Sequence, residues 1–160
     1  AKQRLRSIAE EINDGVLPSV PGTRYYNAGD ASLWVLQSAG RYYDATEDLE
    51  FLAELWPGLL EVVERYSRPG EDFGADEDGL IISGPALTWM DARVEARPVT
   101  PRRGKCCEIN ALWYCALRRM ECFAQALRVP LDPGIAQLAK RVQSSYPGSG
   151  TARTAVFSML

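Results

Sequence analysis

The feature that most constrains the fold is one long stripe of apolar side chains with helical spacing. Between Ile109 and Leu127, apolar residues recur every three or four positions over about five turns. Because side chains on a strand alternate every two residues, only an α-helix places this set on one face. Such a face must pack on other elements. The stripe consists of Ile109, Leu112, Trp113, Ala116, Met120, Phe123 and Leu127.

Five further segments have the same period, and acidic or proline residues mark the start of most of them. They are residues 1–12, a helix capped by Asp30 that runs to about Tyr43, a helix opened by a capping box at 44–47, a continuation that begins at Pro57, and a helix opened by Asp132 and Pro133. Between them, glycines and prolines interrupt the periodic pattern, with a short extended piece at 80–82. The sequence therefore predicts an all-α fold of about five to six helices with a long loop at roughly 68–105.

Composition excludes several classes of function. The 160 residues contain 18 basic and 21 acidic side chains and no histidine. A net charge of -3 disfavours nucleic acid or an anionic membrane as a partner, and the missing histidine excludes His-based catalysis. The N-terminus resembles no signal peptide, and no apolar run is long enough to span a membrane, so a cytoplasmic location is expected. No metal or organic cofactor is implied.

The four cysteines form no Cys-x-x-Cys pair. Cys115 and Cys122 lie seven residues apart, which places them on the same face of the long helix. Buried core thiols are therefore expected at both positions.

Two regions combine aromatic and carboxylate side chains away from the periodic stripes. One is residues 25–34, and the other comprises residues 87–92 and 99–114. Indole rings stack on the apolar face of a sugar while carboxylates and amides bind its hydroxyls, so this composition is typical of a sugar pocket. The alternative is that each Trp belongs to the core and that Asp30 serves as a helix cap.

Three blocks in these regions resemble the amylo-α-1,6-glucosidase domain of glycogen debranching enzymes. They are residues 27–34 (NAGDASLW), 87–92 (LTWMDA) and 99–114 (VTPRRGKCCEINALWY), in the order and spacing of that family. The resemblance covers most of residues 10–128. It implies an (α/α)6 toroid, in which six helical hairpins surround a pocket. It also implies inverting hydrolysis of α-1,6-linked glucose by one protonated and one ionised carboxyl group.

The Trp-Met-Asp motif of the family matches Asp91, which the resemblance makes the general acid. Its two motif neighbours are expected to exclude water, so that the carboxyl group retains its proton. The alternative is that Asp91 is a loop cap or a surface carboxylate. Glu108 has an alternative as well, as an ionic partner of Arg102 or Lys105. The candidate substrate-binding residues are Asp30, Trp34, Trp89, Glu108, Asn110 and Trp113.

The chain also departs from the family. The family's Asp-Gly-Leu-Ile-Pro element is followed by Asn-Arg-Phe, whereas Ser-Val-Pro-Gly follows residues 14–18 here. Twelve helices with their connections need on the order of 200 residues. Residues 1–145 are therefore expected to form the central part of a toroid domain without the catalytic base, which the family carries near its C-terminal end. The tail, 146–160, lacks the expected Phe-Trp-Asn element, but its possible codons permit that element in another reading frame, so we hypothesise a frameshift.

The resemblance implies an α-glucan substrate similar to a glycogen limit dextrin. Without the base, this chain is expected to be inactive alone, and an incomplete toroid is expected to self-associate through exposed helix faces. Two alternatives remain. One is another toroid glycosidase, acting on a trehalose-like or glucosylglycerate-like substrate. The other is a non-catalytic helical module that binds glucan.

Overall fold

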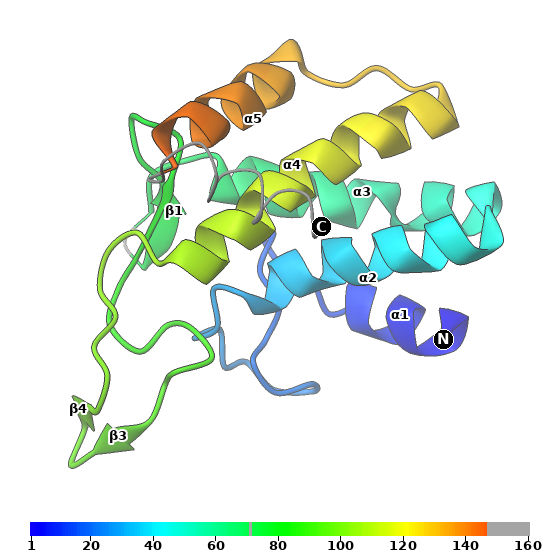
Figure 1. Ribbon diagram of the computed structural model, residues 1–160. Coiled ribbons are helices and arrows are strands. Elements are labelled where there is room, and N and C mark those ends of the chain that lie inside the picture. Colours follow the sequence, from blue (N-terminus) through cyan, green and yellow to red (C-terminus); the bar gives the residue numbers. More distant parts are fainter. Residues whose placement is uncertain (71, 147–160) are drawn as a thin grey trace.

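A computed structural model of the chain describes residues 1–70 and 72–146. It is mostly helical, as expected for an all-α fragment of a toroid (Figure 1). Residues 147–160, to which the frameshift hypothesis applies, lie outside the described range. The described helices are α1 (Lys2–Ala9), α2 (Ala31–Thr46), α3 (Leu49–Tyr66), α4 (Cys107–Leu127) and α5 (Pro133–Ser145), and the strands are β1 (Phe73–Ala75), β2 (Ile81–Ser83), β3 (Arg93–Val94) and β4 (Arg97–Pro98).

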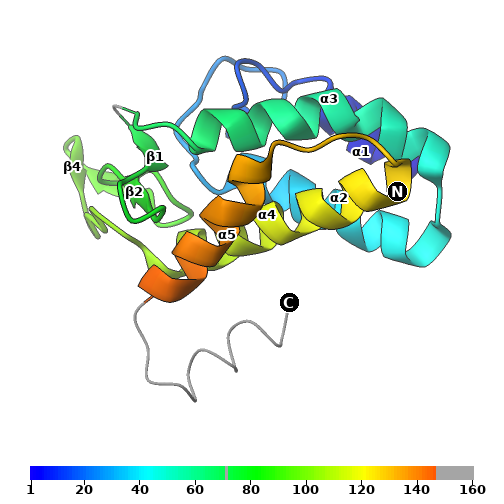
Figure 2. The ribbon, with the colours of Figure 1, turned by 90° about the horizontal axis from the view of Figure 1, so that it is seen from above.

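Helix α4 is the centre of the structure and packs against α2, α3 and α5, while α1 packs on α2 (Figures 1 and 2). Helices α2 and α4 begin at the same end of the molecule, where α3 ends. The stripe predicted for α4 is confirmed: its residues from Ile109 to Phe123 are buried, and Leu127 is partly buried at the edge. This arrangement brings the loops before α2 and α4 to one end of the helices.

Helix α3 differs from the prediction in its start and its continuity. The prediction of a capping box at 44–47 is wrong, because these residues form the last turn of α2 and its left-handed C-cap. Asp48 caps α3 instead, and its carboxylate accepts a hydrogen bond of 3.0 Å from the Phe51 amide. The helix continues through Pro57, although an internal proline removes a backbone hydrogen bond. Apolar residues before and after Pro57, among them Leu55 and Leu59, share one buried face, and this burial offsets the cost.

The predicted long loop contains two antiparallel hairpins, β1–β2 and β3–β4. Strand β2 confirms the extended piece expected at 80–82. Ser83 and Gly104 then exchange two backbone hydrogen bonds of 3.0 and 2.9 Å. Residues 84–103 between them, which we call the arm, are also bonded to each other from Ala86 to Pro101 at 3.1 Å. The arm extends away from the helices and carries β3–β4 at its tip (Figure 1).

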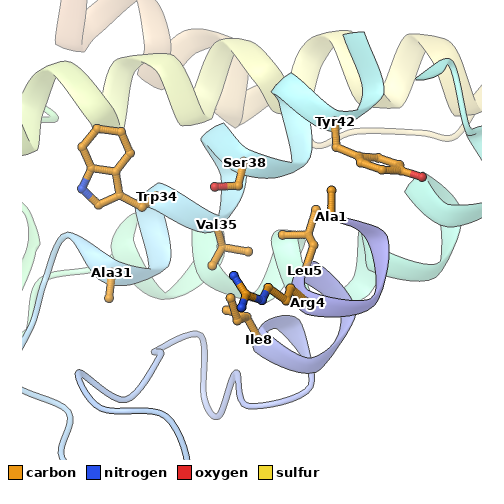
Figure 3. A pocket seen from close by; sticks show the side chains of 9 residues that line it. All are labelled: Ala1, Arg4, Leu5, Ile8, Ala31, Trp34, Val35, Ser38 and Tyr42. Carbon is orange, nitrogen blue, oxygen red and sulfur yellow. The ribbon is translucent and has the colours of Figure 1, made fainter. Parts of the chain in front are cut away.

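Exposed apolar side chains are few on the described helices. Among residues 1–70 and 72–146, only Ile8, Trp34 and Leu49 are exposed large hydrophobic residues within a helix. A cavity of about 370 Å³ lies between α1 and α2, with Leu5 on one side and Val35 on the other (Figure 3). The broad exposed helix faces expected of an incomplete toroid are thus not seen here, and self-association stays a prediction. None of the described helices combines the length and apolar character needed to cross a membrane.

The cysteine prediction is half right. Cys115 is buried, as expected, whereas Cys122 is exposed. Spacing identifies a common helix face, but it does not tell how far the neighbouring helices extend along that face.

Candidate functional site

The loop before α2 is held between the arm and the end of α3. The Gly29 amide donates a hydrogen bond of 2.8 Å to the Leu87 carbonyl of the arm. The Tyr66 hydroxyl of α3 donates one of 2.8 Å to the Gly29 carbonyl. A Cβ atom on Gly29 would lie 3.2 Å from the Leu87 carbonyl oxygen, so a larger residue would push the two segments apart. This contact places Asp30, the next residue, beside the arm that carries Asp91.

Asp30 is a buried carboxylate with little neutralisation. It occupies the N-cap position of α2, but its side chain makes no capping hydrogen bond, so capping does not explain it. Only 9% of the residue is exposed. Burial raises the pKa of Asp30 and the charges of Glu108 and Asp91 raise it further, while hydrogen bonds from its backbone and from Trp34 act in the opposite direction. Asp91 and Glu108, which come from two other blocks of sequence, therefore both lie within electrostatic range of Asp30.

Asp91 lies on the arm just before β3 and is exposed to water. Its neighbour Trp89 is 63% exposed. The expectation that the motif neighbours shield this carboxyl group is therefore not met in the ligand-free chain.

Glu108 forms an ion pair with Arg102 and not with Lys105. Both carboxylate oxygens of Glu108, in the first turn of α4, accept hydrogen bonds from the Arg102 guanidinium of the arm. Lys105 instead pairs with Asp76 and Asp78 of the β1–β2 turn, at 3.0 and 2.7 Å. The Arg102–Glu108 ion pair compensates the charge of Glu108 and connects the arm to α4. The side chain of Arg102 remains 29% exposed and that of Glu108 28% exposed.

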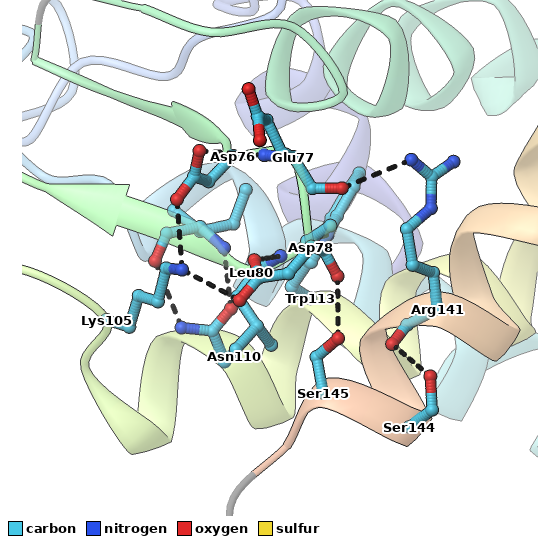
Figure 4. Close-up of polar contacts among 12 residues, drawn as sticks. Asp76, Glu77, Asp78, Leu80, Lys105, Asn110, Trp113, Arg141, Ser144 and Ser145 are labelled. Atoms are coloured by element: carbon cyan, nitrogen blue, oxygen red, sulfur yellow. Dashed lines mark hydrogen bonds and ion pairs between the residues drawn. The ribbon is translucent and has the colours of Figure 1, made fainter.

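Asn110 and Trp113 face the interior, where their polar atoms are bonded to the backbone (Figure 4). The Asn110 side chain accepts a hydrogen bond of 2.7 Å from the Ile81 amide and donates one of 3.1 Å to its carbonyl, as a neighbouring strand would. The Trp113 indole donates one of 3.1 Å to the Gly79 carbonyl. The structure does not bring these two residues to the open surface near Asp30. Both side chains are buried, and they fix β2 and its turn against α4.

The aromatic side chains at this end are strongly exposed. Trp34 on α2 is 53% exposed, and Trp89 on the arm is 63% exposed. Tyr25, which sequence reasoning did not select, is 70% exposed. These are the exposed aromatic side chains of residues 1–70 and 72–146. The only sequence signal that could have identified Tyr25 is its closeness to Asp30 along the chain.

The comparison with known families identifies the family of the chain. The amylo-alpha-1,6-glucosidase sequence profile matches residues 1–150. The chain belongs to the amylo-alpha-1,6-glucosidase family. The matched region includes all the described helices, both hairpins and the arm. No curated protein matches the chain.

For an amylo-alpha-1,6-glucosidase domain, the described groups have distinct chemical capacities. Asp30 is buried, Asp91 is open to water and Glu108 is paired with a guanidinium. Carboxylates accept hydrogen bonds from sugar hydroxyls, and exposed rings offer flat apolar faces. Within the described residues, no group of three or more acidic or cysteine side chains is arranged to hold a metal ion.

Proposed function

We propose that this domain binds α-glucan carrying α-1,6-linked glucose where α2, α4 and the arm meet. The observation that carries the proposal is a buried carboxylate, Asp30, held beside the arm by the Gly29–Leu87 hydrogen bond and within electrostatic range of Asp91 and Glu108. These residues come from the three sequence blocks that carry the family resemblance, and the fold brings them to one end. Family membership supports a glycosidase relationship, and the exposed indoles of Trp34 and Trp89 support a sugar ligand.

In this proposal the three carboxyl groups have different roles. Asp91 is the general acid and donates its proton to the glycosidic oxygen. Asp30 and Glu108 accept hydrogen bonds from sugar hydroxyls, while Trp34 and Trp89 stack against the ring. The sugar itself covers the exposed carboxyl group of Asp91 and excludes water from it. Asn110 and Trp113 contribute by holding β2 and Gly79, and a direct sugar contact by either remains only a prediction.

An inverting reaction also needs an ionised carboxylate on the opposite face of the sugar, about 6.5–9.5 Å from the acid, to activate water. We assign this base to none of the described residues, because the resemblance places it in a late segment without a counterpart here. Binding without turnover is therefore the expected behaviour of this chain. The alternatives are binding of a trehalose-like or glucosylglycerate-like substrate, or glucan binding without selectivity for the branch.

Calorimetric titration of the chain tests this function. The ligands are maltotriose bearing one α-1,6-linked glucose, unbranched maltotriose, trehalose and glucosylglycerate. We expect the branched sugar to bind best, Asp30→Ala to weaken its binding about tenfold or more, and Asp91→Asn to leave the affinity nearly unchanged. Glu50→Gln, on an exposed carboxylate near the start of α3 at the other end of the helices, serves as the charge control.

Each other outcome has a definite meaning. Preference for trehalose or glucosylglycerate would replace the proposal with another toroid glycosidase. Equal affinity for branched and unbranched maltotriose would leave a glucan-binding module. No binding of any of the four sugars would reject the proposed site.

A further inference from the structure

The exposed aromatic side chains lie close in sequence to the proposed catalytic and binding carboxylates. Tyr25 lies five residues before Asp30, Trp34 lies four residues after it, and Trp89 lies two residues before Asp91. Every other aromatic side chain among residues 1–70 and 72–146 is buried or half-buried. Scattered exposed hydrophobic residues need no explanation, but exposed rings confined to the two segments that carry Asp30 and Asp91 indicate a ligand surface. Trp34 and Trp89 already have a role there, whereas Tyr25 has none.

The loop that presents Tyr25 is fixed before any ligand binds. The Ser19 amide and hydroxyl donate hydrogen bonds of 2.6 and 3.0 Å to the Tyr25 carbonyl. The Tyr25 amide in turn donates one of 3.3 Å to the Thr23 hydroxyl. At the tip, the Gly22 amide donates one of 2.6 Å to the Glu11 carboxylate. Because the backbone of Tyr25 is bonded on both sides, stacking on its ring requires little further ordering of the loop.

Chain length limits how far Tyr25 lies from Asp30. Five residues span at most about 17 Å even when fully extended. Trp34 follows Asp30 by about one helical turn and is therefore its immediate neighbour. Tyr25 is on the other side of Asp30 in the sequence, on a loop outside the helix. The exposed ring of Tyr25 thus lies within reach of an extended ligand that is bound at Asp30.

We propose that Tyr25 is a stacking platform for a glucose residue of the glucan that lies beyond the α-1,6-linked pair. This inference rests on the proposed function and makes it more specific, because it assigns the site to branched oligosaccharides and not to disaccharides. Affinity is then expected to increase with the number of glucose units attached to the α-1,6-linked residue.

The test compares isomaltose with the branched tetrasaccharide, 6-α-glucosyl-maltotriose, in titrations of the full chain. Tyr25→Ala is expected to weaken binding of the tetrasaccharide about two- to tenfold, which is the range for one aromatic contact. Binding of isomaltose is expected to stay the same. Tyr25→Phe keeps the ring and is expected to retain the affinity. Val20→Ala removes a 55% exposed apolar side chain from the same loop and serves as the matched control.

The outcomes separate this inference from the function on which it rests. If Tyr25→Ala binds both sugars as the unmodified chain does, the platform is rejected and the sugar site remains. An equal loss of affinity for both sugars also overturns the platform, because it indicates a general disturbance of the loop. If the unmodified chain binds neither sugar, the proposed function fails and this inference fails with it.

Discussion

Removing the hydroxyl of Tyr66 tests how the site is held in place. Tyr66 is 0% exposed, and its ring lies 4.9 Å from that of Phe73 and 6.1 Å from that of Trp113, centroid to centroid. Its hydroxyl donates to the carbonyl of Gly29, the residue before Asp30. Burial raises the pKa of Tyr66, so the hydroxyl keeps its proton and remains a donor at every pH at which the chain is folded.

Tyr66→Phe preserves the ring contacts and leaves the buried Gly29 carbonyl without its donor. Such a loss costs about 1–3 kcal/mol in the free energy of unfolding. With a urea dependence of about 2 kcal/mol per molar for a chain of this size, the unfolding midpoint is expected to fall by about 0.5–1.5 M. Sugar affinity is expected to fall as well, because Gly29 links Asp30 to the arm.

Tyr42→Phe is the matched control, since it removes a hydroxyl that lies 3.2 Å from an Asp48 oxygen at a half-buried position. Asp48 keeps its bonds to Lys2 and to the Phe51 amide, so the expected loss is smaller, about 0.5–1 kcal/mol. Urea titrations followed by circular dichroism measure both variants. Equal midpoints for Tyr66→Phe and the unmodified chain would refute the proposed role of this hydroxyl.

Three further predictions concern charge, thiols and the arm. A hydrogen bond from Lys105 lowers the pKa of Asp76 below its usual value of 3.8. The ionised carboxylate therefore stabilises the fold above pH 3.8, and this contribution is lost as the pH falls through the lowered pKa. In Lys105→Gln, the free energy of unfolding is expected to fall less on acidification than in the unmodified chain. A thiol reagent is expected to label the exposed Cys107 and Cys122 in the folded chain, as counted by mass spectrometry. Cys106 and Cys115 are buried and are expected to react only on unfolding, and burial also raises the pKa of Cys115 to about 11. Ala96 has a φ of 65° in the β3–β4 turn, so Ala96→Gly is expected to slow hydrogen exchange in the arm, and faster exchange would contradict the turn geometry.

The sequence predicted the helices well where one apolar face is continuous. The stripe of α4 and the cap of α5 are confirmed, and the Asp132 carboxylate accepts a hydrogen bond of 2.8 Å from the Gly134 amide. The predicted start of α3 was wrong because aspartate is a good cap at both position 44 and position 48, and tertiary contacts decide which of the two is used. The sequence analysis divided this helix at Pro57, because proline disfavours the interior of a helix. In the structure the helix continues, because its buried apolar face extends past Pro57.

The arm was not predictable, because its order comes from backbone pairing between residues far apart in the sequence. The Ser83–Gly104 and Ala86–Pro101 hydrogen bonds have no signature in composition or spacing. In the same way, the sequence blocks gave the identity of the candidate site residues but not their burial. Asn110 shows the difference, because this polar residue of a block that resembles the family is 1% exposed and bonded to β2.

The most direct test of the proposed sugar site is a map of amide chemical shifts in a nitrogen-15-labelled chain titrated with 6-α-glucosyl-maltotriose. The account predicts saturable changes at Gly29 and Asp30, along the arm from Leu87 to Asp91, and at Glu108, with little change in α5. Trp34 belongs to the proposed site and also lines the cavity between α1 and α2. Changes confined to the other residues of that cavity, such as Leu5, Ile8 and Tyr42, or no changes at millimolar sugar, would contradict the account.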